Sequence, residues 1–557
     1  MRQVVLISGK IRNGKSSLAR QLADEFNYII VRTSQVVQDR ANEQSPKPTR
    51  SALQEMGDRL DQETNFCWIY NEVCRVCSTS DEDVPIVVDS IRNTKQLDCF
   101  RKQKNLNIVH VHLYAPDAER QSRFEAGQKA GGRTEVYASA EAIKNPDDID
   151  YFERDADVRI NTSRSDSQDT FIRVAARLGL YSTPDVRLVD VLVGSQYGSE
   201  GKGHIAAYLA NEYDVLLRVG GPNAGHTVSS ISGVYTYHQL PSGARDTRAK
   251  LLLGPGMTID VEGLLKEIED CNVTPSRLFI DPQAMIISAE DKQTEKGIVK
   301  TIASTGSGSG AATARRITNR GDSTTKLARD IEALRPYVGE SPSYRGSTAR
   351  QLEIAYRQGK TVLFEGTQGS GLSIYHGQYP KVTSRDTNVA GCLAEAGISP
   401  SRIRRIIMVV RPTPIRVANP DGDLGHSSGL LKHETTFEAV AKGAGLDPDE
   451  VTQNEKTSTT RRARRVGWFE WEQFRSACFL NAPTDLVLTF ADYVDARNRN
   501  ARRFEQLSQN TIKFIEELER VAQAPVSLIN TRFPRTADEV NDLRTVIDRR
   551  TWRGTRK

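Results

Sequence analysis

The chain has 557 residues, of which 38% are hydrophobic and 26% are charged, and its formal net charge is +5. This balance suits ordinary globular cores and excludes a disordered chain, and so small a charge over this length gives no reason to expect a nucleic-acid-binding protein. No run of about 18 apolar residues occurs, which excludes a membrane-spanning helix, and the N-terminal residues lack the apolar core of a signal peptide, so we expect a cytoplasmic protein.

The first third of the chain alternates short apolar runs with amphipathic stretches. Apolar runs without polar alternation are typical of buried parallel strands, and the stretches between them are typical of covering helices. The pattern predicts an α/β unit with a parallel sheet. The predicted strands lie at residues 4–8, 85–89 and 108–113, and the predicted helices lie at 16–26 and 51–64.

A phosphate-binding loop lies between the first predicted strand and the first predicted helix. Residues 9–16, Gly-Lys-Ile-Arg-Asn-Gly-Lys-Ser, fit the pattern G-x4-G-K-[ST] at every fixed position. The glycines let backbone amides surround phosphate oxygens, Lys15 would reach the β- and γ-phosphates, and Ser16 would hold Mg²⁺. The loop predicts a nucleoside triphosphate site, and a loop kept only for folding is the alternative. The predicted binding residues are Gly9, Asn13, Gly14, Lys15, Ser16 and Ser17.

A second group of polar residues predicts a site for a phosphoryl acceptor. Asp89 ends a predicted strand, where a carboxylate can hold Mg²⁺ or orient an acceptor, and Arg92 can bind a phosphate through two hydrogen bonds. Three arginines in a glycine-containing stretch are typical of a kinase lid, although they also fit a helix surface: Arg120, Arg123 and Arg133. With the P-loop, these features resemble the nucleoside monophosphate kinases, especially deoxynucleotide and dephospho-coenzyme A kinases. The resemblance implies that Arg50 and Arg92 bind the acceptor nucleotide. These residues fit an active kinase as well as an inactive fold that only binds nucleotides.

Seven cysteines are scattered through the chain, which indicates a reducing compartment rather than a secreted disulfide scaffold. Cys74 and Cys77 form a lone CxxC on a predicted helix. A zinc site needs four ligands, and neither a second CxxC nor a histidine pair follows. We therefore expect neither a zinc site nor a redox site at these two cysteines.

The α/β pattern restarts after a short polar stretch at residues 181–185. We predict a P-loop kinase-like unit at residues 1–182, a second α/β unit at 188–540 and a basic tail at 541–557. The arginine-rich end of the tail, residues 549–557, is expected to be solvated, with an RNA or phosphate contact as the alternative. The predicted buried strands of the second unit lie at residues 188–193, 216–219, 251–253, 362–364, 406–410 and 486–489.

Five segments rich in glycine, threonine or arginine follow in the second unit. The first is a glycine-rich turn that places a lysine at the start of a helix, where backbone amides can bind phosphate. The third is either a flexible loop or a phosphate cradle. The segments are Gly194–Gly203, Gly220–Thr227, Ser304–Gly310, Phe364–Gly369 and Thr459–Trp468. In this order they resemble the adenylosuccinate synthetase family, over about Leu188–Thr536.

The resemblance implies the chemistry of that family. Its members join L-aspartate to a purine 6-oxo nucleotide, using a nucleoside triphosphate (ATP or GTP) and Mg²⁺, usually as homodimers. The purine oxygen attacks the γ-phosphate, and the aspartate amine then displaces phosphate. The resemblance implies catalytic roles for His226, which would donate to the phosphoryl group, for Lys202 in the phosphate-binding turn, and for Ser199 at the position of the base. Ser199 and the carbonyl of Gly225 would hold Mg²⁺.

The same resemblance assigns residues to each substrate. The purine nucleotide would contact Asn223, Ala224, Thr305, Arg315, Gln368, Thr383 and Arg462. L-Aspartate would contact Ser458, Thr459, Thr460, Arg462 and Arg464. The triphosphate would contact Gly198, Glu200, Gly201, Lys202, Gly203, Gly225, Thr227, Arg464, Asp492 and Asn530. Arg315, with Arg316 as the alternative, would reach the nucleotide of a neighbouring subunit.

The chain departs from the family at the catalytic base. Ser199 stands where the family has an aspartate that takes the N1 proton, and Pro222 stands where it has a histidine. A hydroxyl is a weaker base, but it leaves room for an amino group at purine position 2 and can accept a hydrogen bond from it. Both changes resemble a phage and archaeal branch that makes N6-succino-2-amino-2'-deoxyadenylate from dGMP. We therefore expect dGMP as the acceptor, in a host cytoplasm if the source is a virus, and IMP is the alternative.

The donor-base segments also differ from the family. Phe490 replaces a lysine two residues before Asp492, and Asn530–Phe533 replaces Ser-Thr-Gly-Pro. These changes leave ATP, dATP and GTP open as donors. A catalytically inactive nucleotide-binding sensor or assembly protein is an alternative from another class, against which the intact lysines and histidine count. In a third hypothesis the N-terminal unit is also active, on dGMP or on a 2-aminoadenine monophosphate.

Overall fold

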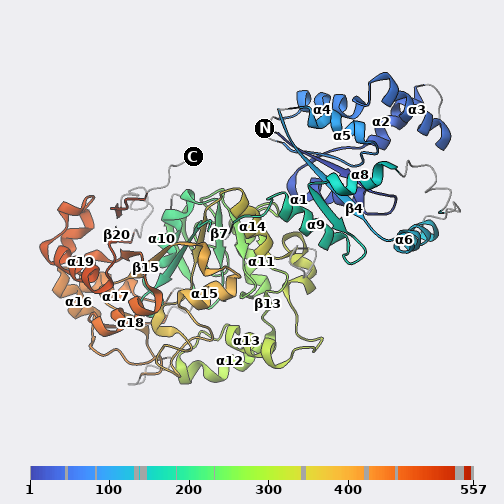
Figure 1. Ribbon diagram of the computed structural model, residues 1–557. Helices are drawn as coiled ribbons and strands as arrows, with labels where there is room; N and C mark the ends of the chain where they lie inside the picture. Colours follow the sequence, from blue (N-terminus) through green and yellow to red (C-terminus); the bar gives the residue numbers. More distant parts are fainter. Residues whose placement is uncertain are drawn as a thin grey trace. The chain divides into compact units, whose positions relative to one another are not determined.

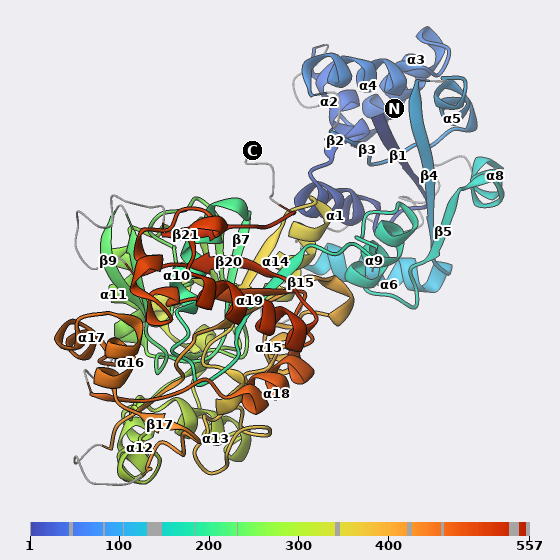
Figure 2. The ribbon, with the colours of Figure 1, turned by 90° about the vertical axis from the view of Figure 1, so that its left-hand side faces the viewer.

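The structure is a computed structural model that describes residues 2–43, 48–81, 84–103, 105–130, 137, 147–183, 185–230, 232–339, 346–419, 426–457, 462–533 and 545–552. The chain divides into two compact units, Met1–Tyr181 (unit 1) and Ser182–Lys557 (unit 2). In each unit, helices lie on both faces of a central β-sheet (Figures 1 and 2). Within the described ranges, no helix combines the length and the apolar character needed to cross a membrane.

Unit 1 is built on a five-stranded parallel sheet with the order β2-β3-β1-β4-β5. The central strand carries an apolar run, Val4–Ile7, that is fully buried because helices cover both faces. The predicted strands at residues 4–8, 85–89 and 108–113 are confirmed as β1, β3 and β4. The strands are β1 (Arg2–Ser8), β2 (Ile29–Val31), β3 (Ile86–Val88), β4 (Leu106–Tyr114) and β5 (Val158–Asn161).

The helices of unit 1 form two layers, one on each face of its sheet. Leu18 and Leu22 of α1 pack with Phe171 of α9 against one face, and Ile69 of α4 packs with Phe100 of α5 against the other. The predicted helices at 16–26 and 51–64 are confirmed as α1 and α3. The helices are α1 (Lys15–Phe26), α2 (Thr33–Asn42), α3 (Arg50–Glu63), α4 (Trp68–Thr79), α5 (Thr94–Arg101), α6 (Asp117–Ala130), α8 (Asp147–Asp155) and α9 (Ser167–Arg177).

Two cysteines of unit 1 are paired, which the cysteine count did not lead us to expect. Cys67, just before α4, and Cys99 of α5 form a disulfide with their Cα atoms 5.7 Å apart. The pairing arises because the start of α4 packs beside α5, a contact that sequence spacing does not reveal. Cys74 and Cys77 lie on α4 as free thiols, as predicted for a helix. Among the described residues, no cluster of three or more His, Cys, Asp or Glu side chains is placed to hold a metal ion.

Unit 2 is built on a nine-stranded sheet with the order β12-β10-β7-β14-β6-β15-β19-β20-β21. All its pairings are parallel except β20–β21 at one edge. The six predicted strands are confirmed as β6, β7, β10, β14, β15 and β19. The sheet strands are β6 (Val189–Gly194), β7 (Val215–Arg218), β10 (Lys250–Leu253), β12 (Leu278–Ile280), β14 (Val362–Glu365), β15 (Ile403–Val410), β19 (Asp485–Leu488), β20 (Val526–Asn530) and β21 (Val546–Asp548).

Two apolar cores lie on opposite faces of this sheet. Neighbouring residues of β14 divide between them, Leu363 in one core and Phe364 in the other, because successive side chains of a strand point to opposite faces. The covering helices are α10 (Lys202–Leu209), α11 (Val261–Asp270), α12 (Ala289–Ile302), α13 (Ser309–Thr318), α14 (Thr348–Arg357), α15 (Val389–Ala396), α16 (Phe437–Ala444), α17 (Pro448–Asn454), α18 (Trp471–Asn481) and α19 (Gln509–Ala522).

Short strands outside the large sheet form three small sheets. Their pairings are β8 with β9, β11 with β13, and β16-β18-β17. The strands are β8 (His226–Ser230), β9 (Gly233–Tyr237), β11 (Thr258–Ile259), β13 (Met285–Ile286), β16 (Ile415–Val417), β17 (Glu434–Thr435) and β18 (Arg464–Gly467).

The expectation of a solvated end at residues 549–557 agrees with Arg549, which is exposed, but not with Arg550, which is buried. Strand β21 pairs with β20 at the sheet edge (Figure 2), and Ile547 is buried. The guanidinium of Arg550 contacts Glu212 and Asp548 at 2.8 Å, and the indole N–H of Trp552 donates to Asp485 at 2.8 Å. The arginine-rich composition hid an ordinary edge strand and its ion pairs.

Candidate functional site

The P-loop of unit 1 is held by its glycines and by Asn13. Gly9 and Gly14 have φ angles of 136° and 89°, a region that favours glycine, and a Cβ on Gly9 would collide with the carbonyl of Leu113. The Asn13 side chain donates to that carbonyl at 2.7 Å, which joins the loop to β4. The Nζ of Lys15 donates to the carbonyls of Gly9 (2.7 Å) and Lys10 (3.0 Å). The amides at the start of α1 and this lysine therefore converge on one turn, as phosphate binding requires.

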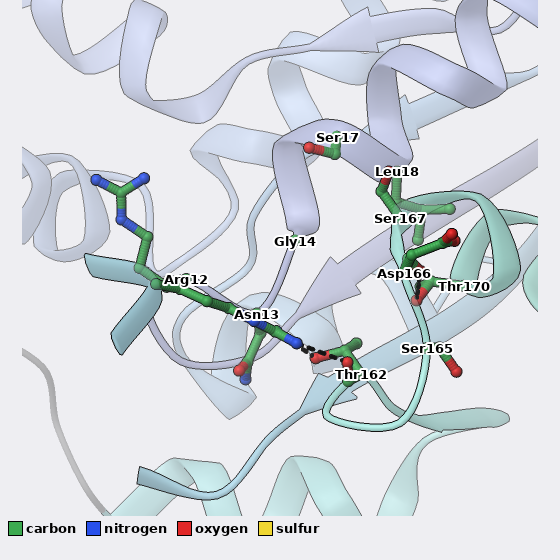
Figure 3. A pocket seen from close by; sticks show the side chains of 11 residues that line it. Arg12, Asn13, Gly14, Ser17, Leu18, Thr162, Ser165, Asp166, Ser167 and Thr170 are labelled. Atoms are coloured by element: carbon green, nitrogen blue, oxygen red, sulfur yellow. Dashed lines mark hydrogen bonds between the residues drawn. The ribbon is translucent and has the colours of Figure 1, made fainter. Parts of the chain in front are cut away.

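A cavity of about 240 Å³ opens beside the P-loop. Figure 3 shows P-loop residues and the segment between β5 and α9 facing it. The Arg123 guanidinium donates to the carbonyl of Thr162 at 2.7 Å and to its hydroxyl at 3.0 Å. Within the described ranges, the Oδ1 of Asn13 is buried and accepts no hydrogen bond. The lining residues are Arg12, Asn13, Gly14, Ser17, Leu18, Arg123, Thr162, Ser165, Asp166, Ser167 and Thr170.

The predicted acceptor residues of unit 1 are described in part. Asp89 follows β3, which lies beside β1, and its carboxylate accepts from the amide (3.1 Å) and hydroxyl (3.3 Å) of Thr33. The amide of Arg92 donates to the Gln96 side chain at 3.0 Å. Asp89 therefore lies at the same edge of the sheet as the P-loop. Arg50 is the first residue of α3, but its side chain lies outside the described atoms, and Arg133 lies outside the described residues.

The phosphate-binding turn of unit 2 lies between β6 and α10. Gly198 and Gly201 have φ angles of 98° and 82°. The Glu200 carboxylate accepts the amides of Gln196 and Gly198, each at 2.9 Å, and pairs with Lys202 at 2.6 Å. Both side chains of this ion pair are 1% exposed. Glu200 thus shapes the turn and holds the lysine charge within it.

His226, the first residue of β8, is fixed by Glu365 at the end of β14. Its Nδ1 lies 2.5 Å from the carboxylate, which also accepts the hydroxyl (2.6 Å) and amide (2.7 Å) of Ser242. Burial lowers the pKa of His226 to about 4, with help from Arg218. Burial opposes ionisation of Glu365, but His226 and Arg218 lower the pKa of that carboxyl to about 2. Glu365 is therefore ionised and His226 neutral, with its proton on Nδ1. Its Nε2 is buried without a hydrogen-bond partner in the described parts of the chain.

Glycines allow the predicted segments of unit 2 to meet. A Cβ on Gly203 would lie 2.5 Å from the Cβ of His226, and a Cβ on Gly198 would lie 3.1 Å from the Cα of Gln368. The phosphate-binding turn therefore touches both the His226 segment and the Gln368 segment. Gln368 itself has a φ angle of 58°, and its side chain accepts from the Thr367 hydroxyl at 2.8 Å.

The remaining predicted purine-nucleotide residues flank this contact. The carbonyl of Ala224 accepts from Arg218 at 2.9 Å, which holds the segment that also carries Asn223, Gly225 and Thr227. The amide of Thr383 donates to the carbonyl of Leu372 at 2.9 Å. These contacts fix the backbone of the two segments.

The loop Ser304–Gly310 is braced by a carboxylate of the chain itself. Glu295 of α12, 4% exposed, accepts the amides of Gly308 at 2.8 Å and of Ala311 at 3.3 Å, and also that of Gly310. The sequence left two alternatives for this loop, a flexible loop and a phosphate cradle. Because these amides donate to Glu295, neither alternative describes them. Thr305 donates to Ser307 at 3.2 Å within the same loop.

Neither candidate for an arginine shared between subunits extends away from its own chain. Arg315 pairs with Asp291 at 2.6 Å and also donates to the carbonyl of Ile286 at 3.0 Å. Arg316 donates to the carbonyl of Pro255 at 2.9 Å. Asp291 of the neighbouring helix binds the Arg315 guanidinium in the single chain, and the role of Arg315 toward a neighbouring subunit stays a prediction.

The segment predicted to bind aspartate is described only in part. Ser458, Thr459 and Thr460 lie outside the described residues. Arg462 donates to the carbonyl of Ser304 at 3.4 Å, and Arg464 pairs with Glu455 at 2.8 Å.

Two residues that sequence reasoning missed, Glu455 and Arg411, adjoin this segment and pair at 2.9 Å. Arg411 follows β15 at the carboxyl end of a parallel strand, a position that could have flagged it. A lone glutamate after a short helix gives no such signal.

The predicted donor-base segments bring two aromatic rings together. The rings of Phe490 and Phe533 are 4.5 Å apart, and Phe533 also packs on His204 at 5.0 Å. The Phe533 ring covers Gly201 of the phosphate-binding turn, where a Cβ would lie 2.5 Å from it. Asp492 pairs with Arg499 at 3.2 Å. The side-chain oxygen of Asn530 is buried and accepts no hydrogen bond from the described residues.

Comparisons with known proteins match unit 2. The family model described as adenylosuccinate synthetase matches residues 191–336 and 326–499. An adenylosuccinate synthetase from Pyrococcus horikoshii is 35% identical over 369 residues, which cover 65% of this chain and 98% of that protein. One from Methanocaldococcus jannaschii is 34% identical over 372 residues, covering 63% and 97%.

Solved structures give the same picture. A succinoaminodeoxyadenylate synthetase from cyanophage S-2L, bound to dGMP and dATP, is 27% identical with a TM-score of 0.50 and covers 64% of this chain and 99% of its own. A fully ligated adenylosuccinate synthetase from Plasmodium falciparum is 20% identical with a TM-score of 0.52, covering 65% and 100%, and this likeness shows the fold alone.

Proposed function

Because this chain belongs to the adenylosuccinate synthetase family of carbon–nitrogen ligases, we propose that unit 2 joins L-aspartate to the purine 6 position of dGMP. The product would be N6-succino-2-amino-2'-deoxyadenylate. The observation that carries the choice of dGMP is Ser199, which stands at the position of the family's catalytic aspartate. The similar cyanophage enzyme, whose structure holds dGMP, supports the same choice.

The reaction proceeds in two steps. The O6 of the purine attacks the γ-phosphorus of the triphosphate, and the bond between that phosphorus and the β-phosphate oxygen breaks and releases the nucleoside diphosphate. The proton on N1 passes to water. The aspartate amine then attacks C6, and inorganic phosphate departs with the former O6. Lys202 and the amides of Gly201 and Gly203 would stabilise the charge on the transferring phosphoryl group.

His226 is suited to serve the phosphoryl group. Glu365 fixes the ring through Nδ1 and leaves Nε2 for a ligand. Without ligand, burial lowers the pKa of His226 to about 4, whereas an anionic phosphoryl oxygen at Nε2 favours the charged, donating form. We propose that the histidine donates from Nε2 to the phosphoryl oxygen once that nitrogen carries a proton.

Magnesium is compatible with the residues at this turn. A magnesium ion bound to nucleotide phosphates and water needs few protein ligands, so the absence of a carboxylate cluster among the described residues does not conflict with it. The Ser199 hydroxyl and the Gly225 carbonyl would hold the ion, which would neutralise phosphate charge when bound.

A serine at position 199 favours a guanine ring over hypoxanthine for a steric reason. Its side chain has two heavy atoms fewer than that of aspartate, and the 2-amino group of guanine would fill the space. The hydroxyl oxygen can accept hydrogen bonds from that amino group. The backbone carbonyl of Ser199 accepts from Arg411 at 3.1 Å, which fixes the position of the residue.

For the donor we propose ATP or dATP. Phe490 has replaced the lysine of the family's guanine-reading segment, and its ring packs on Phe533 beside Gly201. An aromatic surface can stack an adenine base without the lysine. The cyanophage relative, solved with dATP, supports this proposal.

The test of the ligase proposal is direct. The full-length chain is incubated with Mg²⁺, L-aspartate, either dGMP or IMP, and one of ATP, dATP and GTP. The nucleotides are then separated and identified by mass spectrometry. We expect the succinylated product of dGMP with an adenine donor. If none of the six combinations gives a succinylated nucleotide, the inactive nucleotide-binding sensor replaces the ligase.

For unit 1 we propose a phosphotransferase acting on a deoxynucleotide. The support is the P-loop, where Lys15 and the amides at the start of α1 converge on one turn. Asp89 lies at the same edge of the sheet, and a cavity opens beside the loop. An acceptor hydroxyl or phosphate held near Asp89 would receive the γ-phosphoryl group. dGMP and a 2-aminoadenine monophosphate are the candidate acceptors.

We also propose that the chain forms a homodimer, as the family resemblance implies. Tyr375 and Tyr379, which precede Thr383, are 77% and 78% exposed in the single chain. Two exposed aromatic side chains near a substrate segment are suited to a subunit contact. Light scattering is expected to give twice the mass of one chain, 61.9 kDa. A monomer at micromolar concentration would contradict the proposal.

A further inference from the structure

One buried carboxylate in unit 2 is shared by two arginines and a tyrosine. The Oε1 of Glu455 accepts from Arg411 and from the hydroxyl of Tyr493, each at 2.9 Å. Its Oε2 accepts from Arg464 at 2.8 Å. The side chains of Glu455 and Arg411 are 3% and 1% exposed, and that of Arg464 is 16% exposed. Glu455 is thus the centre of a desolvated charge cluster.

Each arginine of this cluster leads to a different part of the candidate site. Arg464 belongs to the segment predicted to bind aspartate. Arg411 donates to the backbone carbonyl of Ser199 at 3.1 Å, and its guanidinium lies 4.0 Å from the ring centre of Phe490. Glu455, which follows α17, therefore links the aspartate segment to the phosphate-binding turn and to the donor-base segment.

The cluster has a net charge of +1, because two guanidiniums share one carboxylate. Burial opposes ionisation of Glu455, but Arg411 and Arg464 lower its pKa to about 2, so the carboxylate is charged at any physiological pH. Two guanidiniums share it, and buried charge without a partner is unfavourable. A carboxylate of the amino-acid substrate, bound by Arg464, would supply the missing negative charge.

We propose that Glu455 is a positioning residue of the ligase, which orients Arg464 toward a carboxylate of L-aspartate and, through Arg411, fixes the Ser199 segment of the phosphate-binding turn. This inference rests on the ligase function proposed for unit 2. Glu455 itself contacts no substrate, because its two oxygens are occupied by groups of the protein.

The first test separates positioning from a purely structural role. Glu455→Gln keeps the shape of the side chain but removes its charge and one acceptor oxygen. We expect the KM for L-aspartate to rise roughly 10- to 100-fold, because a hydrogen-bonded charge next to Arg464 is lost. The KM for dGMP should rise by a smaller factor, because Arg411 keeps its hydrogen bond to the Ser199 carbonyl but loses its charged partner. Tyr493→Phe, which leaves both arginine contacts intact, should keep the KM for aspartate within about threefold of wild type.

A control variant tests whether lost stability explains the result. Glu212→Gln removes the charge of one of the two carboxylates that pair with another buried arginine of unit 2, Arg550, and neither Glu212 nor Arg550 is a predicted site residue. It should lower the midpoint of thermal unfolding and leave the KM for aspartate unchanged. If Glu455→Gln lowers only the unfolding midpoint, as Glu212→Gln does, Glu455 is structural and the proposal is overturned.

A double-mutant cycle tests the route through Arg464. If Glu455 acts by orienting this arginine, Glu455→Gln should add little loss in kcat/KM for aspartate once Arg464→Gln is present. If the two losses multiply in the double variant, the residues act independently and the proposal fails.

Direct binding distinguishes this proposal from the ligase function itself. Calorimetric titration of L-aspartate into the dGMP-loaded protein needs no turnover. Binding that weakens roughly 10- to 100-fold in Glu455→Gln supports the proposal, even if no ligation is detected. Equal binding by wild type and variant, or no binding by wild type, overturns it. Ligation that persists with an unchanged KM overturns the role of Glu455 and leaves the proposed function standing.

Discussion

Ser199 belongs to the phosphate-binding turn, and we propose that its hydroxyl faces N1 of the purine. Around it the charged groups are fixed: Lys202 pairs with Glu200, and Arg411 holds the Ser199 carbonyl. A substitution at this side chain therefore changes the size and charge next to the base without removing a partner from the surrounding ion pairs. This makes position 199 a suitable place to test the choice of purine.

Ser199→Asp is expected to move the preference from dGMP toward IMP. The carboxylate would take the N1 proton more readily, so kcat/KM for IMP should rise about tenfold or more. It would also occupy the space proposed for the 2-amino group, so kcat/KM for dGMP should fall by about the same factor. Steady-state rates with each nucleotide, at saturating aspartate and donor, provide the measurement. An unchanged ratio of the two kcat/KM values would refute the steric explanation.

His226 is expected to contribute mainly to the rate constant. Because Glu365 fixes its ring through Nδ1, His226→Ala removes a positioned group that would donate from Nε2 once protonated, and kcat should fall by roughly 10²- to 10³-fold. The KM for aspartate should change little, since that substrate is assigned to other residues. His433→Ala, at an exposed position, serves as the control. If a His226 variant kept a near-normal kcat, His226 would not be a catalytic residue.

Central elements of unit 1 contain a buried pair of histidines whose protonation opposes folding. The Ser8 hydroxyl at the end of β1 lies 2.7 Å from the Nε2 of His110 and 2.8 Å from the Nδ1 of His112, both on β4. Burial lowers the pKa of His110 to about 3 and that of His112 to about 4. Both values lie below the unfolded pKa near 6.5. The unfolded chain therefore binds more protons between about pH 6.5 and pH 4, and stability falls as the pH is lowered through that window.

Unit 1 should accordingly lose stability in acid, by up to about 1.4 kcal/mol per pH unit for each histidine. Hydrogen exchange of peptides from β1 and β4 at pH 7 and pH 5, corrected for the intrinsic rate, would measure this loss. His112→Asn keeps a side chain able to bond with Ser8 and removes one titrating group, so its stability should depend less steeply on pH. Equal protection of the wild-type strands at both pH values would disprove the linkage.

At the scale of elements, the sequence predicts the buried strands well and the small sheets poorly. Runs such as Val4–Ile7 are continuous and apolar because helices cover both faces of a parallel sheet. Strand β8 begins at His226 and is largely polar, and β11 has only two residues, so neither shows a hydrophobic period. Strand β21 was concealed by the arginines that follow it.

The candidate site was predictable where a local motif carries it and not where distant segments create it. The glycine and lysine pattern of each phosphate-binding turn identifies Lys15 and Lys202 without a structure. Contacts such as Glu455 with Arg411, or Glu295 with the amide of Gly308, join residues whose spacing follows no motif. They depend on how helices and loops pack, and this packing also directed Arg315 to Asp291.

At the scale of the whole molecule, the chain carries two phosphate-binding turns on two separate sheets. Lys15 donates to carbonyls of its own loop, and Lys202 pairs with Glu200 of its own turn. Each lysine is therefore held by contacts inside its own unit. Each unit also has its own apolar cores. Two activities that depend on these lysines should then be separable by single substitutions.

Lys15→Ala is expected to abolish phosphoryl transfer by unit 1 and to leave ligation within about twofold of wild type, because each lysine is held inside its own unit and residues that share no partner act independently. Lys202→Ala should have the opposite effect, with ligation lost and phosphoryl transfer retained. Mass spectrometry of one reaction containing dGMP, ATP and aspartate separates the deoxynucleoside diphosphate from the succinylated monophosphate, so both activities are measured together. A loss of ligation in Lys15→Ala would show that the units exchange substrate or conformation. Unchanged phosphorylation in that variant would instead leave unit 1 as a binding fold without transferase activity.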